Sequence, residues 1–197
     1  MDSLLFAHQL RNRFGEVVSQ PNQFRDEVTL IVSDPERIAD VCAAAKKEFG
    51  FDYLKDISSI DNYGSDPRWT VVYHIYGYGH RCHLRLKTDV SEAKSELPTV
   101  TGVWRGADWH EREVYDMMGI RFRGHPDLRR ILMWEGYPYF PLRKDFPLAG
   151  KSTDVPEVAF SNPAPLEGGP FVTTPGVGHA AAREPRAKVF EEDAKKA

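Results

Sequence analysis

The sequence predicts an α+β fold: a mainly antiparallel β-sheet covered by two or three helices, followed by an extended, irregular C-terminal arm. Three observations support this. Residues 1–118 contain stretches with the apolar spacing of helices and stretches with the two-residue alternation of strands. The strand candidates follow one another through short turns, which favours antiparallel pairing. Beyond residue 147 prolines are frequent and large apolar residues are sparse, so that part lacks the material for a core.

Two helices are expected in the first fifty residues. Apolar side chains recur at helical spacing over residues 3–14 and again over residues 35–49, and a glycine follows each stretch. Asp34 supplies an N-cap before Pro35 at the first helical position. Cys42 lies on the apolar face of the second helix, so we interpret it as a small buried hydrophobe rather than a reactive thiol.

A hairpin is expected between these helices. Residues 16–20 are interpreted as a short extended piece, Pro21-Asn22 as a turn, and residues 27–33 as a strand rich in β-branched residues. Antiparallel pairing of the two extended pieces around that turn is the simplest arrangement.

Three further strands are predicted in series, over residues 53–60, 69–76 and 80–88. The second is rich in aromatic and β-branched residues. The third alternates apolar and polar residues cleanly, and residues 77–79 form a glycine-rich turn before it. Strands in this order, joined by short turns, indicate an antiparallel meander.

The strand pattern argues against a metal site. His80, Cys82 and His83 are zinc-ligand types, but alternation sends Cys82 and His83 to opposite faces of the strand. His74 and His125 add no evident fourth position. The two cysteines of the chain are far apart in sequence, so they cannot supply the four thiolates of an iron–sulfur cluster. We therefore expect no metal or cluster in this chain.

The last predicted helix spans residues 109–118, after a connector over residues 89–107 that holds a short helical turn. Asp108 is placed as its N-cap, with Glu111 in a capping-box position, and Gly119 is placed in the left-handed conformation after the last turn. Helical spacing also puts Glu111 on the apolar stripe of this helix, where its carboxylate needs a partner.

Residues 108–147, called here the signature segment, are unusually dense in charge. On its helix, Arg112 is spaced to meet Asp108 and Asp116, each four residues away. Such pairs contribute only about 0.3–0.5 kcal/mol in water. Removing one partner from a desolvated pair costs roughly 3–5 kcal/mol. So many charges therefore suggest burial against another protein.

Charge is also unevenly distributed along the chain. The formal net charge is −3, yet residues 119–151 hold 7 basic and 3 acidic side chains. The arginines alternate with acids and the aromatics are not spaced as a stacking platform, which favours an acidic protein surface over nucleic acid. No signal peptide and no apolar run long enough for a membrane span is seen, so a reducing cytosolic setting is expected, with membrane association only through partners.

The signature segment resembles one family closely. The matching elements are Glu-Arg-Glu at 111–113, Asp116, Gly119-Ile120, Phe122, the run from Gly124 to Leu132, and the run from Pro141 to Pro147. Together they are similar to the family of the 30-kilodalton (C-type) subunit of respiratory complex I. One departure is local: residues 137–140 intervene between Gly136 and the last run, where the family pattern has only a residue or two.

The resemblance implies a cofactor-free structural subunit in the hydrophilic arm of a proton-pumping NADH:quinone oxidoreductase, peripheral on the cytoplasmic side of the inner membrane. FMN and the iron–sulfur clusters would be held by other subunits. The implied partners are the quinone-site subunit of the 49-kilodalton type and the cluster-bearing subunits of the peripheral arm. The residues implied to be structural or at the subunit interface, none of them catalytic, are Glu111, Arg112, Glu113, Asp116, His125, Asp127, Arg129, Arg130, Arg143, Lys144 and Asp145.

Two alternatives remain open from the sequence. One is the equivalent subunit of a membrane-bound hydrogenase or of a quinone-type dehydrogenase with another electron donor. The other is a stand-alone acid–base enzyme that uses Glu111, Glu113, Asp116 and His125. Against the second, basic residues lie in reach of each acid, and no phosphate-binding loop or nucleophile motif is present. The predicted organisation is a globular domain over residues 1–147 and a proline-rich arm over residues 148–197.

Overall fold

A computed structural model describes residues 3–148 of the chain. Its elements, in order, are α1 (Ser3–Phe14), η1 (Gly15–Val17), β1 (Asn22–Phe24), β2 (Glu27–Val32), η2 (Pro35–Arg37), α2 (Ile38–Lys47), β3 (Tyr53–Asp61), β4 (Trp69–Gly77), β5 (Cys82–Val90), β6 (Glu96–Pro98), α3 (Ala107–Met118) and β7 (Arg121–Arg123). The predicted C-terminal arm, residues 148–197, lies outside the described residues except for residue 148, so the division at residue 147 stays a prediction.

The predicted α+β class is confirmed. Five strands form one sheet in the order β1-β2-β5-β4-β3, and β3, β4 and β5 are the expected antiparallel meander. β2 joins the sheet parallel to β5, with Thr29 opposite Arg85, because α2, β3 and β4 intervene before the chain returns beside it. The sheet is therefore mixed, although most of its pairings are antiparallel.

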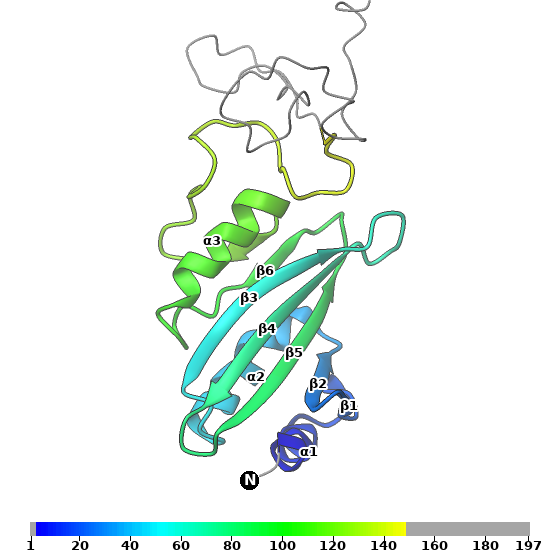
Figure 1. The fold of residues 1–197 in the computed structure, drawn as a ribbon, viewed down its shortest axis with the longest axis vertical. Coiled ribbons are helices and arrows are strands. Elements are labelled where there is room, and N and C mark those ends of the chain that lie inside the picture. The colour runs from blue at the N-terminus through cyan, green and yellow to red at the C-terminus, as the bar shows by residue number, and fades with distance from the viewer. Residues whose placement is uncertain (1–2, 149–197) are drawn as a thin grey trace, which may run out of the picture. The chain divides into compact units, whose positions relative to one another are not determined.

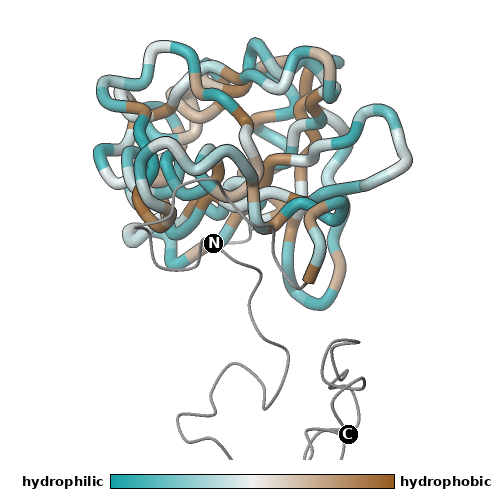
Figure 2. Tube along the Cα trace, turned by 90° about the horizontal axis from the view of Figure 1, so that it is seen from above, coloured by the Kyte–Doolittle hydropathy of each residue, from teal (hydrophilic) through white to brown (hydrophobic). Residues whose placement is uncertain are grey.

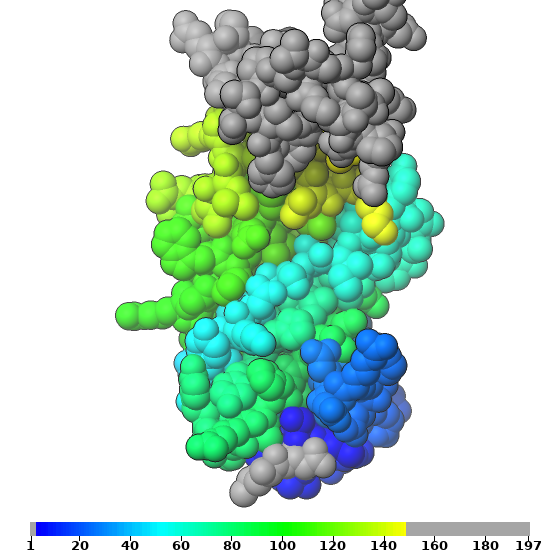
Figure 3. All heavy atoms as spheres, in the orientation of Figure 1, coloured from blue at the N-terminus to red at the C-terminus, as the bar shows by residue number. Residues whose placement is uncertain are grey.

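The helices cover one face of this sheet. Figure 1 shows α2 behind the long strands, and in the space-filling view of Figure 3 atoms of β3 to β5 occupy the middle of the front surface. Apolar side chains from α1, α2 and α3 join the inward residues of the strands in one core cluster. In β5 the predicted alternation holds, with Cys82, Leu84 and Leu86 buried. Cys42 is also buried, as predicted, and burial raises the pKa of its thiol.

The first hairpin differs from its prediction. Residues 15–17 form a 3-10 turn instead of an extended piece, and Val18 makes a single antiparallel bridge to Val32. The strand that pairs with β2 is β1, around a turn at Arg25 and Asp26, which have φ angles of 49° and 66°. Such positive angles suit a tight two-residue hairpin turn, which glycine, asparagine or aspartate usually marks. Only the aspartate is present here, next to an arginine, so the local signal for this turn is weak.

The start of α3 also differs from its prediction. The N-cap position is held by Gly106, without a side-chain cap, and Asp108 lies in the first turn. The turn before the helix supplies the acceptors, since the amides of Ala107 and Asp108 donate to the carbonyls of Trp104 and Arg105. An Asp108 cap is therefore not needed, and Glu111 forms no capping box.

The capping residues predicted at two other places, Asp34 and Gly119, are confirmed. The Asp34 carboxylate accepts a hydrogen bond from the Glu36 amide at 3.0 Å, although residues 35–37 form a 3-10 turn before α2 begins. Gly119 has a φ of 78°, and its amide donates to the Tyr115 carbonyl. One element pair was not predicted: β6 and β7, three residues each, which lie parallel to one another.

Hydrophobic and hydrophilic residues are mixed along most segments, as Figure 2 shows.

Among residues 3–148, no helix is both long and apolar enough to cross a membrane.

Candidate functional site

The signature segment, residues 108–147, contains α3 from its second residue onward, β7 and an irregular strap, defined here as residues 124–145. The strap has no regular helix or strand, so its backbone groups need other hydrogen-bond partners. Three polar networks supply many of these partners and hold the strap on α3 and on the end of the β3–β4 hairpin.

The first network is centred on Asp116 of α3, which has no exposed surface. Its Oδ1 lies 2.6 Å from Arg130 Nη1, and its Oδ2 accepts three successive backbone amides, from Ile131, Leu132 and Met133, at 3.1, 2.7 and 2.9 Å. Arg130 also donates to the carbonyl of Tyr139 at 3.1 Å. One carboxylate thus fixes both a guanidinium and a turn of the strap.

This environment stabilises the charged form of Asp116. Burial alone raises the pKa of the carboxyl, but the hydrogen bonds from the Met133 amide, from Arg130 and from the two other amides outweigh it, so the pKa lies below its ordinary value. A buried carboxylate satisfied in this way is costly to break. The negative charge of Asp116 is therefore balanced by groups of the same chain.

The partners predicted for Arg112 from helical spacing were wrong. Its guanidinium does not pair with Asp108 or Asp116; it donates to the carbonyls of Arg129 and Arg130, at 3.2 and 3.5 Å. The strap lies close enough to offer those carbonyls, whereas Asp116 is already occupied. Arg112 also lies 5.0 Å from the ring centre of Trp109, a cation–π distance.

The second network surrounds Glu111, which points into the core as predicted and has no exposed surface. Its carboxylate accepts from the Val100 amide at 2.7 Å and lies 2.5 Å from the Thr99 hydroxyl. His125 Nε2 lies 3.9 Å from Glu111 Oε2 and 3.2 Å from Asp108 Oδ1. Burial raises the pKa of Glu111 to about 7, opposed by the hydrogen bonds from Thr99 and Val100.

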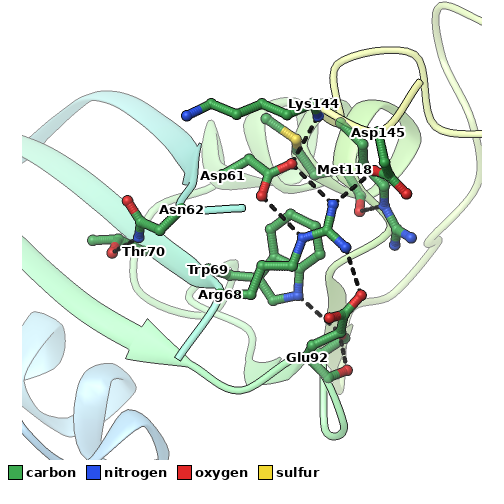
Figure 4. A network of polar contacts seen from close by, with 11 residues as sticks. Asp61, Asn62, Arg68, Trp69, Thr70, Glu92, Met118, Lys144 and Asp145 are labelled. Carbon is green, nitrogen blue, oxygen red and sulfur yellow. Dashed lines mark hydrogen bonds and ion pairs between the residues drawn. The ribbon is translucent and has the colours of Figure 1, made fainter. Parts of the chain in front are cut away.

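The third network is a hub at Arg68, drawn in Figure 4. Arg68 binds both oxygens of Asp61, at 2.9 and 3.0 Å, and also reaches Glu92 at 2.5 Å and Asp145 at 2.7 Å. The amide of Lys144 donates to Asp61 at 2.8 Å. The end of the strap is therefore fixed to the β3–β4 hairpin by side-chain and backbone contacts together.

Arg143 completes the attachment at the end of α3. Its Nε donates to the Met118 carbonyl at 2.7 Å, and its guanidinium lies 4.3 Å from the ring centre of Phe140. Burial lowers the pKa of Arg143, and the neighbouring Arg68 lowers it further. Gly119 makes room for this packing, because a Cβ there would lie 2.8 Å from the Phe140 ring.

The predicted site residues therefore divide into two groups. The buried or half-buried group makes contacts within the chain: Glu111, Arg112, Asp116, His125, Arg130 and Arg143. The exposed group consists of Glu113, Asp127, Arg129, Lys144 and Asp145. Large apolar side chains are exposed in the same segment, with Trp109 and Leu132 each 62% exposed and Leu142 58% exposed.

Three members of the hub were not predicted: Asp61, Arg68 and Glu92. A signal was available for two of them, because Asp61 and Arg68 bracket the turn-rich stretch between the predicted strands and a hairpin would bring them face to face. Nothing in the sequence marks Glu92, which follows β5 and reaches Arg68 only through the tertiary fold.

The four residues of the acid–base alternative do not form one site. Glu111 and His125 come together, but neither side chain is exposed. Asp116 belongs to the separate Arg130 network, and Glu113 is exposed on α3. Within the described residues, no three His, Cys, Asp or Glu side chains are grouped as metal ligands.

Known proteins share this sequence pattern. The family described as "Respiratory-chain NADH dehydrogenase, 30 Kd subunit" matches residues 31–152. The NADH-quinone oxidoreductase C subunit numbered 2 of Rhizobium etli is 42% identical over 160 residues, which cover 80% of this chain and 84% of the relative. The NADH-quinone oxidoreductase C subunit of Geotalea uraniireducens is 44% identical over 142 residues, which cover 72% and 86% of the two chains.

Solved structures share the fold. A trypsin-resistant fragment of Nqo5 superposes with a TM-score of 0.53 and 32% identity, covering 63% of this chain and 97% of the fragment. A chain of an archaeal membrane-bound sulfane sulfur reductase superposes with a TM-score of 0.64, covering 73% of this chain and 85% of its own, but at 22% identity the likeness is one of fold alone.

Proposed function

The chain belongs to the family of the 30-kDa subunit of respiratory-chain NADH dehydrogenase, and from this premise we propose that it is a non-catalytic structural subunit of a proton-pumping NADH:quinone oxidoreductase. It lies in the hydrophilic arm, peripheral on the cytoplasmic side of the inner membrane. Electrons pass from NADH through FMN and iron–sulfur clusters on partner subunits to quinone. This chain contributes shape and contacts rather than a reacting group.

The observation that carries this proposal is that the buried carboxylates of the polar networks already have hydrogen-bond partners within the chain. Asp116 and Asp61 are occupied by arginines and by backbone amides, and Glu111 by Thr99 and Val100. A general acid or base needs access to a substrate proton. Asp116 and Asp61 instead hold the strap in place, and Glu111 is held by Thr99 and Val100 in the core, which is the behaviour of a scaffold.

Exposed side chains of the signature segment support a further part of the proposal, that this chain docks partner subunits. Trp109, Leu132 and Leu142 are large apolar side chains left in solvent, in the same segment as the charged pair of Arg129 and Asp127. Exposed aromatic and arginine side chains are the types that dominate protein interfaces. We assign this surface to the quinone-site subunit and to cluster-bearing subunits of the peripheral arm.

Purification of the intact assembly through a tag on this chain tests the proposal. We expect NADH:quinone oxidoreductase activity and the quinone-site subunit to copurify, while the isolated chain turns over neither NADH nor quinone. Turnover by the isolated chain would overturn the scaffold role. Copurification of hydrogen-dependent instead of NADH-dependent quinone reduction would favour the hydrogenase-type alternative.

A further inference from the structure

We propose that Glu111 is a reversible proton-binding site inside the subunit, connected to solvent by the hydroxyl groups of Thr99 and Thr101. The oxygens form a chain: Glu111 Oε2 lies 2.5 Å from Thr99 Oγ1, which lies 2.9 Å from Thr101 Oγ1. Thr99 and Thr101 also line an open hollow on the surface, with Arg105 and Asp108 among its walls. The buried carboxylate is thus two hydroxyl groups away from solvent.

The Thr99 hydroxyl is fully used when Glu111 is ionised. It donates to Glu111 Oε2 and accepts from both the amide and the hydroxyl of Thr101, at 3.1 and 2.9 Å. The Val100 amide donates to Glu111 Oε1 at 2.7 Å. Because a hydroxyl has one donor and two acceptor positions, Thr99 has no capacity left over in this state.

The same oxygens stay hydrogen-bonded when Glu111 is protonated. The proton on Thr99 moves to Glu111 Oε2, the proton on Thr101 moves to Thr99, and a proton from solvent replaces it on Thr101. Glu111 then donates to Thr99, and Thr99 donates to Thr101, with no heavy atom displaced. Both protonation states keep the oxygen-to-oxygen hydrogen bonds, which avoids the penalty of an unpaired buried polar group.

The groups around Glu111 provide no fixed cation. His125 Nδ1 accepts the Asp127 amide at 3.0 Å, which assigns the ring proton to Nε2. Nε2 lies 3.3 Å from the Asp108 carbonyl oxygen, 3.2 Å from Asp108 Oδ1 and 3.9 Å from Glu111 Oε2. Asp108 itself opposes a second negative charge nearby. From the elements across the core, Cys42 and Tyr73 interact electrostatically with the carboxylate; burial raises the pKa of both, so they are neutral.

The other buried carboxylates differ from Glu111 in having a cation as partner. Asp116 is paired with Arg130 and Asp61 with Arg68, and in both cases the pKa is lowered. Within residues 3–148, neither lysine nor arginine forms an ion pair with Glu111. Burial therefore dominates at Glu111 and raises its pKa to about 7.

The test is the titration of the Glu111 carboxyl carbon by NMR in the full chain, with two substitutions of opposite expected effect. Thr99→Val removes the donor to the ionised form, so the Glu111 pKa should rise. Thr101→Val removes the acceptor that Thr99 needs when Glu111 is protonated, so the pKa should fall. We expect shifts of about one unit, a tenfold change in proton affinity.

Two further variants serve as controls for this titration. Thr101→Ser retains the hydroxyl and should leave the titration unchanged, and Glu113→Gln, on the exposed side of the same helix, should remove a different signal only. A Glu111 pKa near that of a free glutamate in the unsubstituted chain would overturn the proposal. Shifts of the same sign in Thr99→Val and Thr101→Val, or no shift in either, would overturn the hydroxyl connection.

Discussion

Arg130 Nη1 lies 2.6 Å from Asp116 Oδ1, although the two residues are fourteen positions apart along the chain. Asp116 is fully buried and the Arg130 side chain is 13% exposed, so this pair closes the strap over α3 away from bulk water. The other oxygen of Asp116 accepts three backbone amides of the strap, so this carboxylate also fixes a turn of the strap.

Asp116→Asn should destabilise the subunit strongly. The amide group presents a donor where acceptors are needed and leaves the Arg130 charge without its counterion. We expect a loss of about 3–5 kcal/mol in the free energy of unfolding, measured by urea denaturation of the full chain. The matched variant Asp127→Asn removes an exposed pair with Arg129 and should cost about 1 kcal/mol or less. Equal losses in the two variants would refute the structural role given to Asp116.

Arg68→Lys should loosen the end of the strap. Lysine keeps the charge but loses the two-oxygen grip on Asp61 and the simultaneous reach to Glu92 and Asp145. Hydrogen exchange at the Lys144 amide, which donates to Asp61, reports this directly. We expect at least a tenfold faster exchange there, corresponding to about 1.4 kcal/mol. Arg37→Lys, in an exposed pair with Asp40, should leave that amide unchanged.

Gly119→Ala and Gly106→Ala should have opposite effects. Gly119 has a φ of 78° and its added Cβ would lie 2.8 Å from the Phe140 ring, so we expect a loss of about 1–3 kcal/mol. Gly106 has a φ of −64° at the start of α3 and open space around it, so alanine there should be neutral or stabilise by up to about 1 kcal/mol. Thermal unfolding of both variants measures the difference, and a stabilised Gly119→Ala would contradict the packing described.

Stability should decline on both sides of mildly acidic pH. The pKa of Glu111 is raised to about 7 in the folded chain, so its contribution is full below the unfolded value and is lost as pH rises toward and past 7. The pKa values of Asp61 and Asp116 are lowered, so their contributions are lost as pH falls below about 4.

Glu111→Gln distinguishes the loss of stability at neutral pH, called here the neutral limb, from the loss at acidic pH, called the acid limb. It should abolish the decline between about pH 5 and 8, on the order of 2–3 kcal/mol, without changing the acid limb, because glutamine does not titrate. Urea midpoints across pH measure both limbs. An unchanged neutral limb in Glu111→Gln would assign that decline to another group.

Local patterns predicted the long elements and one buried charge. The alternation in β5 and the helical spacing that turned Glu111 inward both act over a few residues, so the sequence displays them directly. Asp116 with Arg130, and Arg68 with Glu92, meet only after irregular segments fold back, and no periodicity governs those segments. The turn at residues 25–26 was missed because no glycine marks its positive φ angles, and one of them belongs to an arginine, which seldom adopts such an angle.

The central claim, that the signature segment serves assembly rather than chemistry, is tested most directly by activity normalised to the amount of assembled complex. Trp109→Ala and Arg129→Ala alter exposed side chains, 62% and 70% accessible, and should leave the subunit folded. Native gels stained for NADH oxidation and quantified for protein compare them with Lys47→Ala, an exposed residue outside the segment. We predict several-fold less assembled complex in both variants, with the same activity per complex as the unsubstituted chain. Full assembly with depressed turnover per complex would contradict the claim.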